Sequence, residues 1–110
     1  MTTYTLKRKE AKTITFTITD DDGAAVDVSS ATQTFEMKKQ NSLNAESVVT
    51  IADGDFTKTQ ATSGIISCVL TSTHTDRVGS FIGELETVFN STNIDKSDNI
   101  YINIEDAVTE

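Results

Sequence analysis

Strict alternation of apolar and polar residues between Lys12 and Thr19 constrains the fold more than any other feature of this chain. Ile14, Phe16 and Ile18 occupy every second position, and threonines stand between them. An extended strand sends successive side chains to opposite faces, and β-branched residues fit a half-buried pleated surface. The segment is therefore predicted to be a strand with one face in a core and the other in solvent.

The same alternation recurs along the rest of the chain, in short segments separated by turn-forming residues. Residues 20–23 (Asp-Asp-Asp-Gly) and 53–55 (Asp-Gly-Asp) are typical turn sequences, because aspartate side chains bond nearby amides and glycine adopts positive φ. Further along the chain, a single helical turn is expected from Ser72, which would cap it, to Asp76, with Gly79 ending it. We predict further strands over residues 25–28, 32–38, 48–51, 56–60, 65–71, 80–89 and 100–104, with polar loops over 39–45 and 90–99.

These segments place the chain in the all-β class. Together with the strand at 12–19 they number eight, at spacings typical of a two-sheet sandwich or a barrel. The 110 residues are enough for one core, so we expect a single domain over residues 1–110. Within it, residues 1–11 are expected to form an N-terminal arm or edge strand, and residues 106–110 a flexible tail.

Cysteine content and hydropathy indicate where such a chain is made. Cys68 is the single cysteine, so it cannot form an internal disulfide, and it fits synthesis in a reducing cytoplasm. The first residues lack the apolar stretch of a signal peptide, and no segment approaches the roughly 20 apolar residues that span a bilayer. We therefore expect neither a signal peptide nor membrane insertion.

The charge of the chain is both large and uneven. A formal net charge of −8 opposes binding to the polyanionic backbone of nucleic acids. Residues 1–12 carry Lys7, Arg8, Lys9 and Lys12 against one glutamate, a local +3, which leaves −11 for the remainder. A basic arm on an acidic body could dock on a neighbouring copy, and these four residues are candidate assembly contacts. The simpler interpretation is a solvated strand end.

Groups that could carry chemistry are sparse. His74 is the only histidine, and neighbours two residues away do not supply the geometry of a catalytic triad. Cys68 alternates with apolar residues and is expected in the core, where a thiol is unreactive. Glu84 and Glu86 share one strand face instead of facing each other across a cleft, and the run at 20–23 lacks the pattern of a calcium loop. We expect no enzyme, no metal site and no cofactor.

Two blocks of sequence carry a resemblance. Residues 13–38, TITFTITDDDGAAVDVSSATQTFEMK, form a strand, an acidic turn, an apolar-Asp-apolar segment and a Thr-rich strand ending in lysine. Residues 63–86, SGIISCVLTSTHTDRVGSFIGELE, form a strand ending in Leu-Thr, a polar turn, and a strand with an aromatic residue after its glycine. This order resembles the immunoglobulin-like N-terminal domain of phage baseplate upper proteins and related small tail proteins, over residues 12 to 104.

The resemblance implies an immunoglobulin-like antiparallel β-sandwich of seven to eight strands. It also implies a non-enzymatic virion component of the tail or baseplate, which assembles with copies of itself or with other phage tail proteins. No catalytic residue is carried over. An alternative for the same fold class is an adhesion module that binds carbohydrate or a surface, with a shallow polar site at the loops 39–45 and 90–99. A small hydrolase that depends on His74 is a third hypothesis.

Overall fold

The computed structural model describes residues 2–40, 47–97 and 99–108, and these form strands with two short 3₁₀ turns. The turns are η1 (Asp53–Asp55) and η2 (Ala61–Ser63). The strands are β1 (Thr2–Lys7), β2 (Lys12–Thr17), β3 (Thr32–Lys39), β4 (Val49–Ile51), β5 (Thr57–Gln60), β6 (Ile65–Leu70), β7 (Gly79–Asn90), β8 (Asn93–Lys96) and β9 (Ile100–Glu105).

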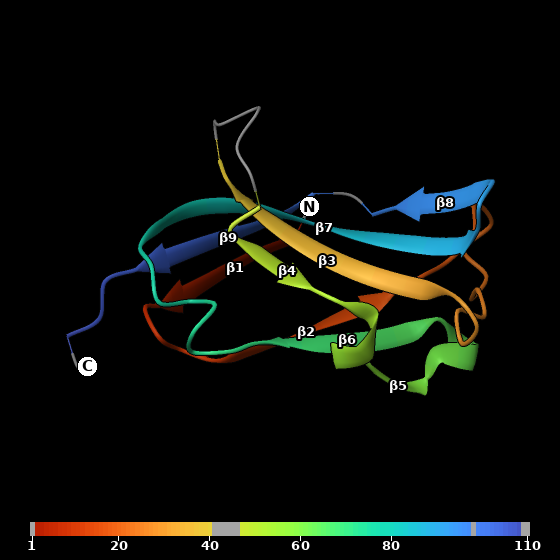
Figure 1. Ribbon diagram of the computed structural model, residues 1–110, viewed down its shortest axis with the longest axis horizontal. Helices are drawn as coiled ribbons and strands as arrows, with labels where there is room; N and C mark the ends of the chain where they lie inside the picture. Colours follow the sequence, from red (N-terminus) through yellow and green to blue (C-terminus); the bar gives the residue numbers. More distant parts are fainter. Residues whose placement is uncertain (1, 41–46, 98, 109–110) are drawn as a thin grey trace.

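The strands lie in two sheets that pack face to face (Figure 1). The larger sheet has six strands in the order β1-β9-β7-β3-β4, with β8 also paired to β7, and the smaller sheet has the order β2-β6-β5. Sheets that are apolar on one face are stable when they bury those faces against each other. The predicted all-β class and the two-sheet sandwich are confirmed, and a barrel is excluded.

One strand pair departs from the expected antiparallel arrangement. β1 runs parallel to β9, with Thr3 opposite Tyr101 and Leu6 opposite Ile104, whereas the other pairs between named strands are antiparallel. β1 lies at one edge of the larger sheet, and the chain then crosses to β2 in the smaller sheet. The single-domain boundaries stay a prediction, as does the flexible tail at 106–110, of which residues 109–110 lie outside the described part.

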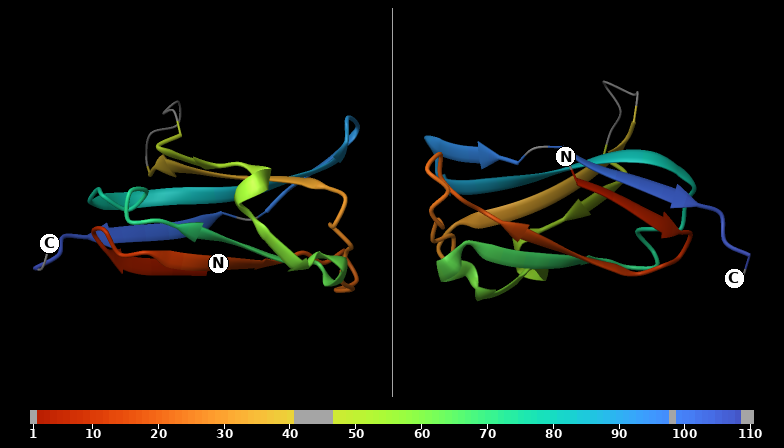
Figure 2. Two further views of the ribbon diagram at one scale, coloured as in Figure 1. Left: turned by 60° about the horizontal axis from the view of Figure 1, so that its bottom comes forward. Right: turned by 180° about the vertical axis from the view of Figure 1, so that it is seen from behind.

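β7 is the longest strand, and it is shared by two neighbours on the same side. Its first half pairs with β9 from Gly79 to Gly83, and its second half pairs with β8 from Glu86 onward. Ser97 closes the gap between them, because its N–H donates to the Leu85 carbonyl at 2.9 Å and its Oγ accepts from the Leu85 N–H at 2.9 Å. The hairpin of β7 and β8 and the C-terminal end of β9 lie at opposite ends of the sandwich (Figure 2).

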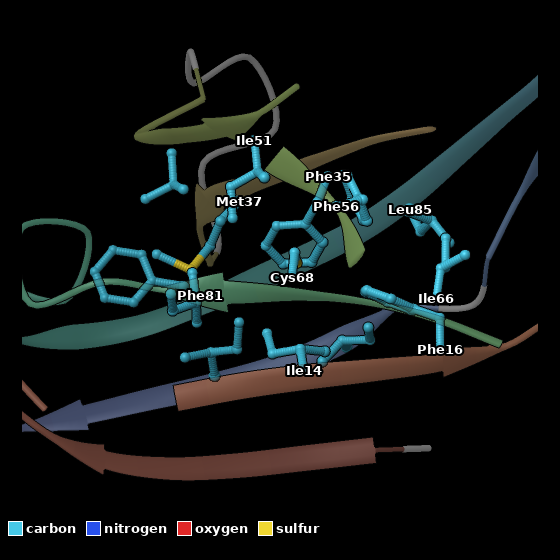
Figure 3. Close-up of a cluster of buried hydrophobic side chains, with 14 of the residues drawn as sticks. Ile14, Phe16, Phe35, Met37, Ile51, Phe56, Ile66, Cys68, Phe81 and Leu85 are labelled. Atoms are coloured by element: carbon cyan, nitrogen blue, oxygen red, sulfur yellow. The ribbon is translucent and has the colours of Figure 1, made fainter. Parts of the chain in front are cut away.

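The core fills the space between the sheets with the inward residues of both (Figure 3). Ile14, Ile66 and Cys68 project from the smaller sheet, and Phe35 and Met37 from the larger one (all buried). The alternation that predicted these strands therefore also predicted their buried faces. Gly83 belongs to the same packing, since a Cβ at this position would lie 2.5 Å from Cζ of Phe35.

Three predicted elements were wrong. The segment 25–28 is not a strand: it forms one isolated bridge at Ala25, and Val28 donates its N–H to the Ala61 carbonyl in η2. The predicted helical turn at 72–76 is a hydrogen-bonded turn that starts at Thr71, whose hydroxyl accepts from the His74 N–H. The loop 90–99 contains β8, which a tight turn at Asn90 folds back onto β7.

Candidate assembly surfaces

The predicted basic residues lie at one end of the sandwich, where β1 turns into β2. Lys7 ends β1, and its Nζ lies 3.1 Å from a carboxylate oxygen of Glu105, at the end of the neighbouring β9. Arg8 follows, with Nε 3.4 Å from a carboxylate oxygen of Asp76. Both pairs are substantially exposed, so each is worth little to stability. They nevertheless partly neutralise the basic arm within its own chain.

Lys9 is held outward by the turn itself. Its backbone has a φ of 69°, in the left-handed region that non-glycine residues seldom adopt. The turn is fixed by hydrogen bonds, because the Lys9 N–H donates to the Thr75 carbonyl at 3.1 Å and the Thr75 hydroxyl donates to the Glu10 carbonyl at 2.8 Å. Within the described ranges the ammonium of Lys9 has no ion-pair partner. Of the four candidate assembly contacts, it is the one most available to another molecule.

Lys12 is separated from the other three basic residues. Its ammonium lies 5.9 Å from the ring centroid of Tyr4 on β1, within the range of a cation–π contact. This contact joins β2 to β1 across the open side of the sandwich. The structure therefore brings Lys7, Arg8 and Lys9 together at one turn, which we call the basic turn (residues 7–10), and gives Lys12 a local packing role.

The outer face of the larger sheet carries carboxylates. Glu36 on β3 lies directly opposite Glu84 on β7, and Glu86 follows on the same face. Glu86 pairs with Lys96 of β8 at 3.6 Å, and Glu36 accepts a hydrogen bond from Ser47 Oγ at 2.9 Å. Like charges directly opposite each other in a sheet are destabilising. We call this surface the carboxylate face (Glu36, Glu84 and Glu86).

The outer face of the smaller sheet has a different character. The residues that point outward from β2, β6 and β5 are uncharged: Thr13, Thr15, Thr17, Ile65, Ser67, Val69 and Thr57. A shallow hollow of about 210 Å³ lies on this face, lined by Thr15, Thr57, Thr59, Gln60, Ile65, Ile66 and Ser67. Sequence reasoning did not find this hollow, although the threonine alternation in β2 marks one of its walls.

The groups considered for catalysis have local structural roles. His74 accepts the Thr71 N–H on its Nδ1 at 3.1 Å, inside the turn that precedes β7. Burial raises the pKa of the Cys68 thiol to about 12, so the nucleophilic thiolate is rare near neutral pH. Asp53 accepts hydrogen bonds from Lys58 and from the Gln33 N–H, which together hold the pKa of its carboxyl below the usual range.

The loops at which the site of an adhesion module is expected are described only in part. Residues 41–46 lie outside the described residues, and the other loop contains β8. In the ranges that the structure covers, no helix has the length and hydropathy of a membrane-spanning segment. Nor do the described side chains gather three or more metal-binding groups at one place.

Comparison with known proteins gives a likeness of fold. Over 93% of this chain and 83% of the other, the structure is similar to the N-terminal domain of phage TP901-1 ORF48, with a TM-score of 0.64 and 12% sequence identity. The other chain belongs to a phage. At this identity the likeness shows the fold and nothing of the function. No protein-family model matches the sequence, and no curated protein matches it.

Proposed function

We propose that this chain is a structural protein of a phage virion, a tail or baseplate component that acts through protein–protein contacts. The observation that carries the proposal is the likeness of nearly the whole chain to a domain of a phage protein. The resemblance of residues 13–38 and 63–86 to baseplate upper proteins supports it independently, since it rests on sequence.

The strand order supports an immunoglobulin-like assignment for the sandwich. In variable-type immunoglobulin domains one sheet carries strands G, F, C and C′, and the other carries B, E and D. The order β9-β7-β3-β4 against β2-β6-β5 follows this arrangement strand for strand. Greek-key sandwiches of this type occur in many surface and assembly domains, so the assignment is compatible with the role without requiring it.

For the mode of assembly, we propose a contact between the basic turn of one copy and the carboxylate face of the next. Lys9 is an exposed cation at one end, and on the other surface Glu36 and Glu84 place two mutually repelling charges directly opposite each other, with Lys38 further along the same face of β3. A lysine placed between two carboxylates relieves that repulsion, so the contact gains more than an isolated surface ion pair. The two surfaces are different patches, and such heterologous contacts generate rings or open assemblies.

A charge-exchange experiment tests the contact. Light scattering over a protein concentration series at low salt is expected to show self-association, which weakens as salt screens the charges. Lys9→Glu alone and Glu84→Lys alone should each give monomers. An equimolar mixture of the two variants should associate again, because the intact basic turn of Glu84→Lys meets the intact carboxylate face of Lys9→Glu, and the two changed surfaces also carry opposite charges. Thr32→Lys is the matched control, because Thr32 lies on the same outward face of the larger sheet but away from Glu84.

Monomers of the wild-type chain at every concentration would overturn self-association but not the virion role. The virion role is tested separately by mass spectrometry of gradient-purified phage particles from a strain that encodes this chain. Detection of its peptides at a fixed ratio to other tail proteins is the expected result. Their absence from particles that contain all other tail components would contradict the proposal.

A further inference from the structure

We propose that the hollow on the outer face of the smaller sheet binds one neutral sugar ring. The inference is independent of the assembly role, because the hollow lies on a different face from the basic turn and the carboxylate face. It also places a saccharide site away from the loops at the ends of the sandwich. Three features of the face support the proposal: the register of its three strands, its unpaired hydrogen-bonding groups and its lack of charge.

The register aligns hydroxyl groups across the whole sheet. Thr15 of β2 lies opposite Ser67 of β6, and Ser67 in turn lies opposite Thr57 of β5. Neighbouring strands are roughly 4.8 Å apart, so three hydroxyls form a row about 10 Å long. Such a row can bond several hydroxyls of one ligand at the same time. No two of these residues are neighbours in the sequence.

An irregularity in β5 creates the hollow beside this row. The pairing of β5 with β6 shifts between Thr57 and Gln60, so that two residues, Lys58 and Thr59, lie opposite the single Ile66. A bulge of this kind disrupts the ladder and bends the strand locally. Thr59 and Gln60 thereby join the lining and add a hydroxyl and an amide to the row. Bulges are common next to binding sites for this reason.

The polar groups of the lining are free to bond a ligand. Within the described residues, none of the lining hydroxyls makes a hydrogen bond to another protein group (Thr15, Thr57, Thr59 and Ser67). Each can both donate and accept, as sugar hydroxyls do. Ile65 completes the lining and offers apolar contact to the C–H groups of a ring, whereas the side chain of Ile66 is buried in the core. A saccharide presents this combination of alternating hydroxyl and C–H groups.

The charge and size of the hollow narrow the ligand class. No charged residue lines it, and the nearby Lys58 is engaged by Asp53 and by the Ala31 carbonyl. A carboxylated or sulfated sugar would find no cation there and would be repelled by a chain of net charge −8. At about 210 Å³ the hollow is smaller than the usual site of a drug-sized ligand and has room for a single ring. The hollow therefore fits one ring of a longer polysaccharide.

Binding of a single ring should be weak. The hollow is open and has no aromatic residue in its lining, so we expect a dissociation constant on the order of 10 mM for a monosaccharide. Several copies on one particle would raise the apparent affinity for a surface polysaccharide by avidity, without any new contact.

Amide chemical shifts of the isotope-labelled chain test the proposal. Glucose, galactose and N-acetylglucosamine are titrated to about 100 mM, roughly tenfold above the expected dissociation constant. At least one of them should shift the amides of Thr15, Thr57 and Ser67 in a saturable way, whereas N-acetylneuraminate should not. Thr15→Val and Thr57→Val remove a hydroxyl with little change of shape and should each weaken binding by roughly tenfold. Thr13→Val, on the same face of β2 but outside the lining, should bind as the wild-type chain does.

Several outcomes would overturn the proposal. One is no saturable shift with any of the neutral sugars. Others are equal shifts with the anionic sugar, or equal weakening by Thr13→Val and Thr15→Val. Shifts of the lining amides on changing protein concentration without sugar would show that a second copy covers this face, and would also count against a sugar site. The sugar titrations and the threonine variants leave the assembly proposal unaffected, because its variants lie on other faces, whereas concentration-dependent shifts confined to the lining would count against both proposals.

Discussion

The outer faces of the two sheets are built on the same alternating pattern, yet they carry opposite chemistry. The larger sheet sets Glu36 opposite Glu84 and pairs Glu86 with Lys96. The smaller sheet aligns the hydroxyls of Thr15 and Ser67 and has no charged residue pointing outward from its strands. Behind both faces lies one shared core.

The difference shows which part of each strand the fold dictates. Inward positions must be apolar and of matching size, because the interior of a protein is closely packed. Outward positions need only be compatible with solvent. Charged side chains there cost some stability where like charges meet, whereas hydroxyl groups cost almost none. Function in such a domain is accordingly sought on the outer faces and at the turns.

Breaking the shared core should have the largest effect. Phe35 is fully buried, and its ring centroid lies 5.9 Å from that of Phe16 on the opposite sheet. Phe35→Ala leaves a cavity between the sheets and should lower the free energy of unfolding by about 3–5 kcal/mol. Urea denaturation followed by circular dichroism measures this. Thr32→Ala, on the outward side of the same strand, should change stability by less than about 0.5 kcal/mol.

Adding a single methyl group to the core should have the next largest effect. In Gly83→Ala the new Cβ would lie 2.5 Å from Cζ of Phe35, so the ring must shift. We expect a loss of about 1–3 kcal/mol, as for other overpacked cores. When Phe35 is already replaced by leucine, Gly83→Ala should cost less, because the smaller side chain leaves room for the new methyl group. Gly54→Ala has open space around its Cβ and serves as the control; equal losses in the two alanine variants would contradict the account.

Asp53 connects the edge of the smaller sheet to the larger one, and its contribution should depend on pH. Lys58 and the Gln33 N–H lower the pKa of its carboxyl in the folded chain from the ordinary 3.8. Its stabilising effect is therefore complete above that value and is lost as pH falls through the lower folded pKa. Asp53→Asn should cost about 1 kcal/mol at neutral pH, a typical hydrogen-bond contribution.

Thermal unfolding of Asp53→Asn between about pH 6 and 2.5 checks this sign. The difference from the wild-type chain should shrink at acid pH, because the wild-type carboxyl is then protonated. Asp55→Asn, an exposed neighbour in the same turn, should follow the wild-type curve throughout. A constant difference at all pH values would show that the charge of Asp53 does not matter.

The smallest expected effect distinguishes the two outer faces directly. Glu84→Gln removes the repulsion from Glu36 and should stabilise the chain by about 0.2–1 kcal/mol at low salt, with the gain reduced at high salt. Glu86→Gln instead loses the pair with Lys96 and should not stabilise. If Glu86→Gln stabilised the chain as much as Glu84→Gln, only the net charge would matter. The position of Glu84 directly opposite Glu36 would then have no effect on stability.

The sequence predicted the strands whose alternation is long and regular, and it failed where structure depends on partners distant in the chain. β2 and β7 were predicted with their buried faces, because Ile14 and Leu85 fall in unbroken patterns. β8 has only exposed residues and exists because the turn at Asn90 returns the chain to β7. The segment 25–28 has the right residues for a strand, but Val28 packs in the core and bonds to the Ala61 carbonyl instead.

The candidate surfaces were predicted only in part. Lys7, Arg8 and Lys9 were found from their charge, but their ion pairs with Glu105 and Asp76 depend on the ends of other strands. The opposition of Glu36 and Glu84 depends on register, and so does the hydroxyl row. The hollow additionally needs a bulge in β5, for which the sequence has no local signal.

Amide chemical shifts recorded while the unmodified chain is diluted at low salt test the central claim most directly. We expect the amides of residues 7–10 and those around Glu36 and Glu84 to shift with concentration, whereas those of Thr15, Thr57 and Ser67 on the other sheet do not. Concentration-dependent shifts confined to the outer face of the smaller sheet would contradict it, because the uncharged face would then be the assembly surface.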